Sequence, residues 1–271
     1  MKKKILVPTD LTSTADKAIF QALAMAKKME ADVELISVVS DDTLPAELVE
    51  MDLNTEIVRL RKKTGITCER KVLKGSLMSV IEKFPYTENH PLMVIGTHGI
   101  HGLRQRLIGS NILKLVSKSS IPVLVVQEKS PLVKNFNRIV LPVASHASFY
   151  KAVHAVTCMA ELYQSEICLY SIQKNGFVWP DQLVKNIELA ISTFEEHHVK
   201  VTRVREGQNV YSQGYAKQTL NYAHSVNADA ICIMSIPSRE YYYFAQADKE
   251  HTLLNDHYIP VLCAGGGFEE I

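Results

Sequence analysis

The second half of this 271-residue chain repeats the first half. The segment Ile5–Asp10 aligns with Ile139–Ala144 at an offset of 134 residues, and Ile121–Leu124 aligns with Ile259–Leu262 at an offset of 138 residues. The drift of four residues fits one small loop insertion. A repeat of this length indicates a duplicated domain, because the units of solenoid proteins are far shorter. The sequence therefore predicts two domains, residues 1–130 and 135–271.

Each copy alternates short apolar runs, rich in β-branched residues, with longer segments of helical character. Expected strands lie near 3–9, 32–39, 66–73, 91–96 and 121–126, and again near 137–143, 165–172, 198–204, 229–234 and 259–263. Expected helices lie near 13–30, 45–64, 76–88 and 109–119, and again near 147–163, 180–197, 210–226 and 246–256. Apolar runs without polar alternation are typical of parallel strands covered on both faces. Each copy is expected to form an α/β, Rossmann-like domain with a doubly wound five-stranded parallel sheet.

Composition favours a cytoplasmic protein that contacts neither membranes nor nucleic acid. Residues 1–134 carry a net charge of +5 and residues 135–271 a net charge of −4, without the dense basic stripe of a nucleic-acid surface. Pro8 interrupts the apolar run Ile5–Val7, which is too short for an export signal, and no run reaches membrane-spanning length. The five cysteines are scattered and show no disulfide or zinc spacing.

A glycine pattern marks the most informative local site. The run Gly96-x2-Gly99-x9-Gly109-Ser110 follows the apolar segment 92–95 and precedes a segment of helical character. Glycines let a phosphate approach the backbone, and unpaired N–H groups at a helix N-terminus attract anions. The pattern lacks the Gly-Lys-Ser/Thr ending of a Walker loop. It therefore predicts an anion site of another kind at the carboxyl ends of the strands.

Together with Pro8-Thr9-Asp10 after the first strand and Ser37-Val38-Val39 at the end of the second, this pattern resembles the universal stress protein family in its ATP-binding subclass. The resemblance spans both halves and implies a tandem member of that family. It implies that Asp10 contacts the ribose or adenine side, that Pro8 and Thr9 line the same wall, and that the Val39 backbone reads the adenine edge. The residues it assigns to the phosphates are Gly96, Gly99, Gly109, Ser110, Asn111 and Ile112. The implied cofactor is ATP or a related adenine nucleotide, with or without Mg²⁺.

The second copy departs from this pattern at every diagnostic position. Asp10 is replaced by Ala144, and Gly96 by Met234. Further along the aligned loop and helix stand Pro237, Ala247 and Asp248, where the first copy has Gly99, Gly109 and Ser110. A carboxylate repels a phosphate, and proline lacks an N–H donor. The second copy is therefore expected not to bind a nucleotide in the family's manner. The aromatic run 241–244 would plug its cleft, pack on the other domain or receive a different apolar ligand.

The resemblance implies a regulatory stress-response protein in which nucleotide occupancy biases a conformation or a partner surface. It also implies pairing of the two domains through the edges Val123–Val126 and Val261–Cys263, which protects apolar strands; a homodimer of whole chains is compatible with this. No catalytic triad or metal cage is recognisable, since His98 and His101 lack a third ligand, so any ATP hydrolysis is expected to be slow. Two alternatives remain: a nucleotide-free protein-interaction module, and an enzyme of adenylyl or phosphoryl transfer.

Overall fold

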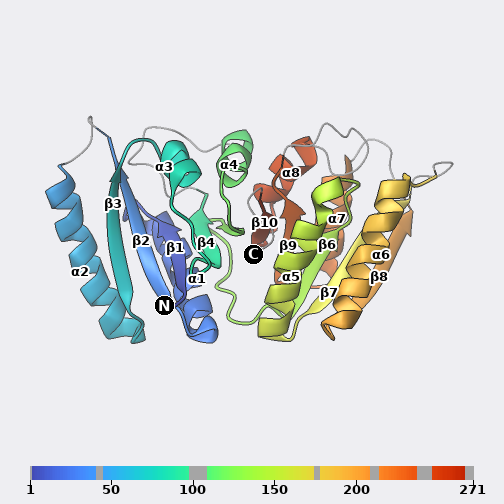
Figure 1. Cartoon of the computed structure of the whole chain (residues 1–271), viewed down its shortest axis with the longest axis horizontal. Coiled ribbons are helices and arrows are strands. Elements are labelled where there is room, and N and C mark those ends of the chain that lie inside the picture. Colours follow the sequence, from blue (N-terminus) through green and yellow to red (C-terminus); the bar gives the residue numbers. More distant parts are fainter. Residues whose placement is uncertain are drawn as a thin grey trace. The chain divides into compact units, whose positions relative to one another are not determined.

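A computed structural model describes residues 2–40, 45–97, 109–173, 178–207, 214–236 and 246–265 (Figure 1). These residues fall into two compact units, the first drawn from Met1–Lys134 and the second from Asn135–Gly265. The predictions for Gly99, for Pro237 and for the aromatic run 241–244 concern residues outside the described ranges.

The first unit is a five-stranded parallel sheet with helices between its strands. Its strands follow the order β3-β2-β1-β4-β5, so the chain adds strands first on one side of β1 and then on the other (Figure 1). The elements are β1 (Lys4–Pro8), α1 (Ser13–Met29), β2 (Asp32–Val39), α2 (Ala46–Thr64), β3 (Cys68–Lys74), α3 (Leu77–Lys83), β4 (Leu92–Gly96), α4 (Gly109–Val116) and β5 (Val123–Val126).

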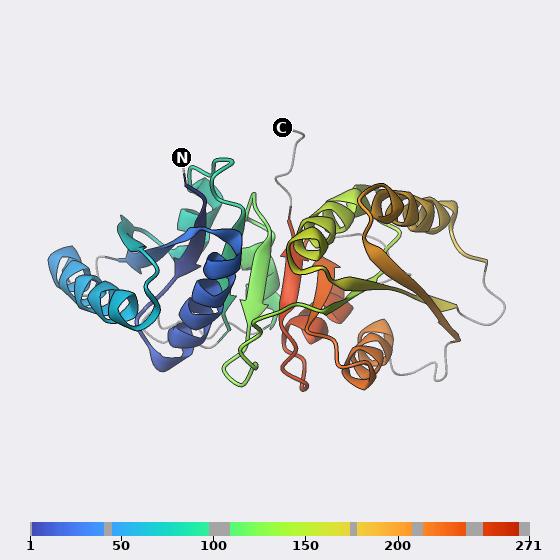
Figure 2. The ribbon, with the colours of Figure 1, turned by 90° about the horizontal axis from the view of Figure 1, so that it is seen from below.

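The second unit repeats this topology. Its strand order, β8-β7-β6-β9-β10, matches that of the first unit position by position. The elements are β6 (Arg138–Pro142), the 3-10 turn η1 (Ala147–Phe149), α5 (Tyr150–Tyr163), β7 (Glu166–Gln173), α6 (Asp181–Glu196), β8 (Lys200–Gly207), α7 (Gly214–Ser225), β9 (Ala230–Met234), α8 (Gln246–Leu253) and β10 (Val261–Ala264). In this unit, α5 and α6 cover one face of the sheet and α7 and α8 the other (Figure 2). The predicted fold class is confirmed in both halves.

Local capping explains where several helices begin and end. Thr12 precedes α1, and its side chain accepts a hydrogen bond from the Ala15 N–H. Ser76 caps α3 in the same way, with its Oγ 3.2 Å from the Ser79 nitrogen. The prediction that this helix continues to residue 88 is wrong, because α3 ends at Lys83. Phe84 is extended, with ψ of 135°, since the proline that follows it disfavours a helical backbone.

The core of the first unit includes the chain that follows its last strand. Gln21 of α1 is buried, its Nε2 donates to the Val133 carbonyl at 2.8 Å, and the Val133 N–H donates to its Oε1 at 3.0 Å. The Lys17 ammonium also donates to the Ser130 carbonyl at 3.3 Å. A polar side chain in this position is stable because both its donor and its acceptor are satisfied. These bonds fix residues 130–133 against α1.

In the second unit, Asn255 organises the turn that leads into β10. Its Nδ2 donates to the carbonyls of Thr252 and Ile259 at 2.9 Å each, and its Oδ1 accepts from the Ile259 N–H at 2.9 Å. Asn255 is fully buried. We expect Asn255→Ala to lower the free energy of unfolding by about 2 kcal/mol, because it leaves buried backbone groups without partners. Urea unfolding followed by the fluorescence of Trp179, the only tryptophan, measures this.

The control for that experiment is Ser225→Ala, at the exposed end of α7 in the same unit. It should change the free energy of unfolding by less than about 0.5 kcal/mol. An Asn255→Ala midpoint indistinguishable from that of Ser225→Ala would show that the Asn255 hydrogen bonds do not hold this turn.

A second measurable feature is the charge cluster at the start of β6, β7 and β8. Glu166 accepts hydrogen bonds from the Thr202 hydroxyl at 2.6 Å and from Arg138 Nη2 at 3.0 Å, with Lys200 Nζ at 3.5 Å. The bonds from Thr202 and Arg138 lower the pKa of Glu166 below its ordinary value. A carboxyl whose pKa is lowered by folding stabilises the fold above its unfolded pKa, and this contribution is lost as the pH falls through the folded pKa.

We therefore expect Glu166→Gln to make the second unit less sensitive to acid. The urea midpoint of the wild type should fall between pH 7 and about pH 3 by more than that of Glu166→Gln. Glu188→Gln, on the exposed side of α6, serves as the control and should keep the wild-type dependence. Identical pH profiles for Glu166→Gln and the wild type would contradict this account.

Candidate functional site

The candidate site of the first unit lies where the strand order reverses, between β1 and β4. These strands pair in register, with Ile5 opposite Leu92 and Leu6 opposite Met93. Continuing that register by three residues places Thr9 opposite Gly96. From there β1 leads into α1 and β4 leads toward α4, on connections that run in opposite directions along the sheet. Such a switch point opens a crevice at the carboxyl ends of the strands, where ligands of doubly wound sheets bind.

The loop after β1 holds Asp10 in a defined conformation. Asp10 Oδ1 accepts hydrogen bonds from the Thr12 N–H at 3.1 Å and from the Thr12 hydroxyl at 2.7 Å. Thr9 is buried, and its hydroxyl oxygen accepts from the Leu11 N–H at 3.0 Å. Leu11 has a φ of 59°, in the left-handed region that branched residues rarely occupy. The half-exposed carboxylate therefore stands on a tight loop at the N-terminus of α1.

The backbone at the end of β2 is already hydrogen-bonded within the protein, which the sequence does not indicate. Val39 is 5% exposed, and its carbonyl accepts a hydrogen bond from the Gly75 N–H at 2.9 Å. Gly75 has a φ of 131°, a conformation that only glycine adopts readily. The Val39 carbonyl thus has one lone pair engaged before any ligand arrives. The sequence alone gave no sign of this contact, because it depends on the turn after β3.

The residues that the family resemblance assigns to the phosphates include the end of β4 and the start of α4. Gly96 is buried and pairs with Val126 of β5. The helix α4 begins at Gly109 and has no acidic residue in its first turn, so nothing there opposes an anion. Asn111 is half-exposed, whereas Ile112 is fully buried. Ile112 therefore offers a ligand only its backbone.

The same row of the second unit is apolar. Ile139 pairs with Ala230 and Val140 with Ile231, and the continued register places Val143 opposite Met234. Both side chains are buried, at 4% and 3% exposure. Where the first unit has Thr9 and Gly96, the second has the buried apolar residues Val143 and Met234. This row offers no polar group to a sugar or a phosphate.

In the second unit, an aspartate stands in the first turn of the helix that corresponds to α4. Asp248, in the first turn of α8, accepts a hydrogen bond from the Ala216 N–H at 2.9 Å, so its carboxylate caps the N-terminus of α7. Its neighbour Lys249 is buried and donates to the Ile236 carbonyl at 2.6 Å. Burial, reinforced by the charge of Asp248, raises the pKa of Tyr215 to about 12 and keeps that hydroxyl neutral.

The loop of the second unit that corresponds to Thr9–Leu11 is tied to a helix. The buried Asn186 of α6 donates its Nδ2 to the carbonyls of Ala144 at 2.6 Å and His146 at 2.9 Å. At the 134-residue offset the first unit has Asp52 in place of Asn186, and Asp52 is exposed on α2. Asn186 was missed by sequence reasoning, since a lone asparagine within a helix carries no signal.

The described residues contain neither a cluster of metal ligands nor a membrane-spanning helix. They contain no group of three or more His, Cys, Asp or Glu side chains able to hold a metal ion. Within the same ranges, no helix has the length and apolar character needed to cross a membrane.

The strand order defines a doubly wound α/β protein, and the glycine-bearing sequence follows β4 at its switch point. The profile of the Universal stress protein family matches residues 1–127. Universal stress protein MJ0531 of Methanocaldococcus jannaschii is 30% identical over 140 residues, covering 46% of this chain and 82% of the relative. Universal stress protein MJ0577 of the same organism is 25% identical over 158 residues, covering 48% and 98%. The chain therefore belongs to the universal stress protein family.

A solved structure extends the likeness in fold to both units. The crystal structure of a universal stress protein from Archaeoglobus fulgidus DSM 4304 has a TM-score of 0.71 and 16% identity to this chain. The match covers 98% of this chain and 97% of that one. The family profile thus matches only the first half, whereas the likeness in fold includes the second.

The capping role of Asp248 can be measured. We expect Asp248→Ala to lower the stability of the second unit by about 1 kcal/mol, the usual cost of losing a helix cap. Amide exchange at Ala216 and its neighbours should accelerate, because the first turn of α7 opens more often. Hydrogen exchange read by mass spectrometry tests this, with Asp256→Ala, an exposed aspartate of the same unit, as the control. Unchanged exchange in α7 would contradict the assignment.

Proposed function

We propose that the first unit binds ATP, or a related adenine nucleotide, and that the second unit is a degenerate copy that does not. The observation that carries this proposal is the contrast between two equivalent helix N-termini. The first turn of α4 has no acidic residue, whereas the first turn of α8 has Asp248 bonded to α7. A carboxylate in the first turn of a helix weakens the attraction of that N-terminus for an external anion, because like charges repel.

In this proposal each residue of the crevice has a distinct task. The Asp10 carboxylate accepts hydrogen bonds from the ribose hydroxyls, and Pro8 and Thr9 form the wall beside it. The backbone at Val39 faces the adenine edge. The phosphates accept hydrogen bonds from the Ser110 hydroxyl and from backbone N–H groups. The residues assigned to the phosphates are Gly96, Gly99, Gly109, Ser110, Asn111 and Ile112.

The proposed role is regulatory, with nucleotide occupancy biasing the conformation of the first unit in a cytoplasmic stress response. Hydrolysis is expected to be slow. Mg²⁺, when it accompanies ATP, would be held chiefly by phosphate oxygens, since the described residues provide no three-ligand cluster.

Equilibrium binding of ATP, measured by calorimetry on the whole chain, tests the proposal. We expect one nucleotide per chain. Ser110→Asp and Gly109→Asp should each weaken binding by about tenfold or more, because a new carboxylate would repel the phosphates. Ser117→Asp is the matched control: it adds the same charge just beyond the other end of α4 and should leave the affinity within about twofold.

Three results would contradict the proposal. Absence of saturable binding would favour the nucleotide-free interaction module. Two nucleotides per chain would show that the second unit is not degenerate. Equal loss of affinity in Ser110→Asp and Ser117→Asp would place the phosphates elsewhere.

A further inference from the structure

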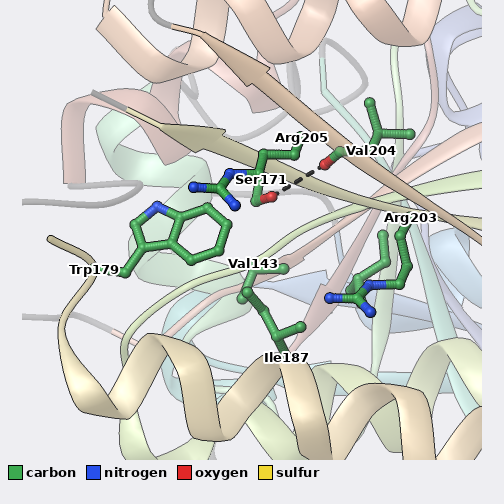
Figure 3. A pocket seen from close by; sticks show the side chains of 8 residues that line it. Val143, Ser171, Trp179, Ile187, Arg203, Val204 and Arg205 are labelled. Atoms are coloured by element: carbon green, nitrogen blue, oxygen red, sulfur yellow. Dashed lines mark hydrogen bonds between the residues drawn. The ribbon is translucent and has the colours of Figure 1, made fainter. Parts of the chain in front are cut away.

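The second unit contains a small cavity of its own, away from the β6–β9 crevice. It lies between the sheet and α6, over β7 and β8, and has a volume of about 60 Å³ (Figure 3). Its lining combines apolar, aromatic and cationic side chains, and Val143 is the one member that also belongs to the crevice row. The lining residues are Val143, Leu169, Ser171, Trp179, Ile187, Arg203, Val204 and Arg205.

The floor of the cavity is hydrocarbon. Val143, Leu169 and Ile187 are all buried, with exposures of 4%, 3% and 7%. The Ser171 hydroxyl beside them donates to the Val204 carbonyl at 3.0 Å, so its proton is directed at the strand (Figure 3). A ligand portion resting here would have to be apolar.

The rim of the cavity is cationic. Arg203 and Arg205 are two residues apart on β8 and therefore lie on the same face of the sheet. The Arg205 guanidinium lies 4.4 Å from the centre of the Trp179 ring and donates from Nη2 to Gln173 Oε1 at 2.9 Å. In the part of the chain that the structure describes, neither arginine has a carboxylate within ion-pair distance.

Comparison with the first unit shows that this rim is peculiar to the second. In register, Leu35 pairs with Arg70 as Leu169 pairs with Arg203, and Arg70 has Glu50 of α2 at 3.9 Å. At the 134-residue offset, Glu50 corresponds to Val184.

The second unit thus lacks an acidic residue at the position of Glu50. It differs from the first unit at two further positions around the cavity. Ser37 pairs with Val72 where Ser171 pairs with Arg205, so the second unit gains a cation. Trp179 precedes Pro180, the N-cap of α6, whereas Leu44 precedes Pro45, the N-cap of α2. The second unit has therefore lost an acid and gained a cation and an aromatic ring around one cavity.

We propose that this cavity binds a short-chain aliphatic monocarboxylate of about the size of butyrate. The alkyl chain lies on the Val143–Leu169–Ile187 floor, and the carboxylate accepts hydrogen bonds from the guanidinium groups at the rim. A water-sized sphere needs about 10–15 Å³, so the cavity of about 60 Å³ holds about four to six such spheres, which is close to the six non-hydrogen atoms of butyrate. This site is independent of the proposed nucleotide site.

Trp179 makes the proposal directly measurable, since it is the only tryptophan of the chain and lines the cavity. The experiment titrates the whole protein with sodium butyrate at constant ionic strength and follows the Trp179 fluorescence. Acetate, octanoate, butyramide and inorganic phosphate are the comparison ligands. We expect saturable binding of butyrate about fifteenfold tighter than that of acetate, because each of its two additional buried methylenes contributes about fourfold. Octanoate, butyramide and phosphate should bind more weakly than butyrate.

Arg203→Gln tests the charge requirement without disturbing the tryptophan stack. It should weaken butyrate binding by about tenfold, a typical loss for a hydrogen bond to a charged group. Arg70→Gln, at the corresponding position of the first unit, is the matched control and should change nothing. The proposal is overturned if butyrate gives no saturable signal, if butyramide or phosphate binds as well as butyrate, or if the two variants behave alike.

Discussion

The pairing of β1 with β4 is the constraint on which the candidate site depends. Every other strand of the first unit is added outward from this pair, and the helix connections leave it in opposite directions. Because the ladder is in register, the loop that carries Asp10 and the connection that begins at Gly96 emerge from neighbouring points of one edge. Backbone hydrogen bonds, strengthened by the burial of Ile5, Leu6 and Val7, hold this pair of strands together.

In the second unit, side chains of the protein itself occupy or bond the positions that correspond to the candidate site of the first. Its strands follow the same order and its crevice row follows the same register, yet Met234 fills the place of Gly96. Asp248 caps α7, and Asn186 fixes the loop after β6. Each of these contacts satisfies a backbone group that would otherwise need a ligand or water. The second unit has the strand order of the first, and its own side chains bond the backbone at these two places.

Much of the fold could be predicted from the sequence, because buried parallel strands and a long internal repeat both leave clear patterns. The predicted end of α3 is five residues too late. Pro85 indicates the true end, because a proline disfavours a helical backbone at the residue before it. The candidate site was predictable only as a set of residues. The Gly75–Val39 contact and the role of Asn186 depend on which backbone groups face each other across the fold, and no spacing along the chain encodes that. The Trp179 cavity required the register of β7 against β8.

The Gln21 side chain has a consequence for where the first unit can be separated from the rest of the chain. Both of its polar atoms are occupied by Val133, seven residues beyond the end of β5. A fragment that stopped at residue 130 would contain every strand and helix of the unit, but it would leave a buried amide facing nothing. A fragment that keeps both hydrogen bonds of Gln21 therefore has to extend through Val133.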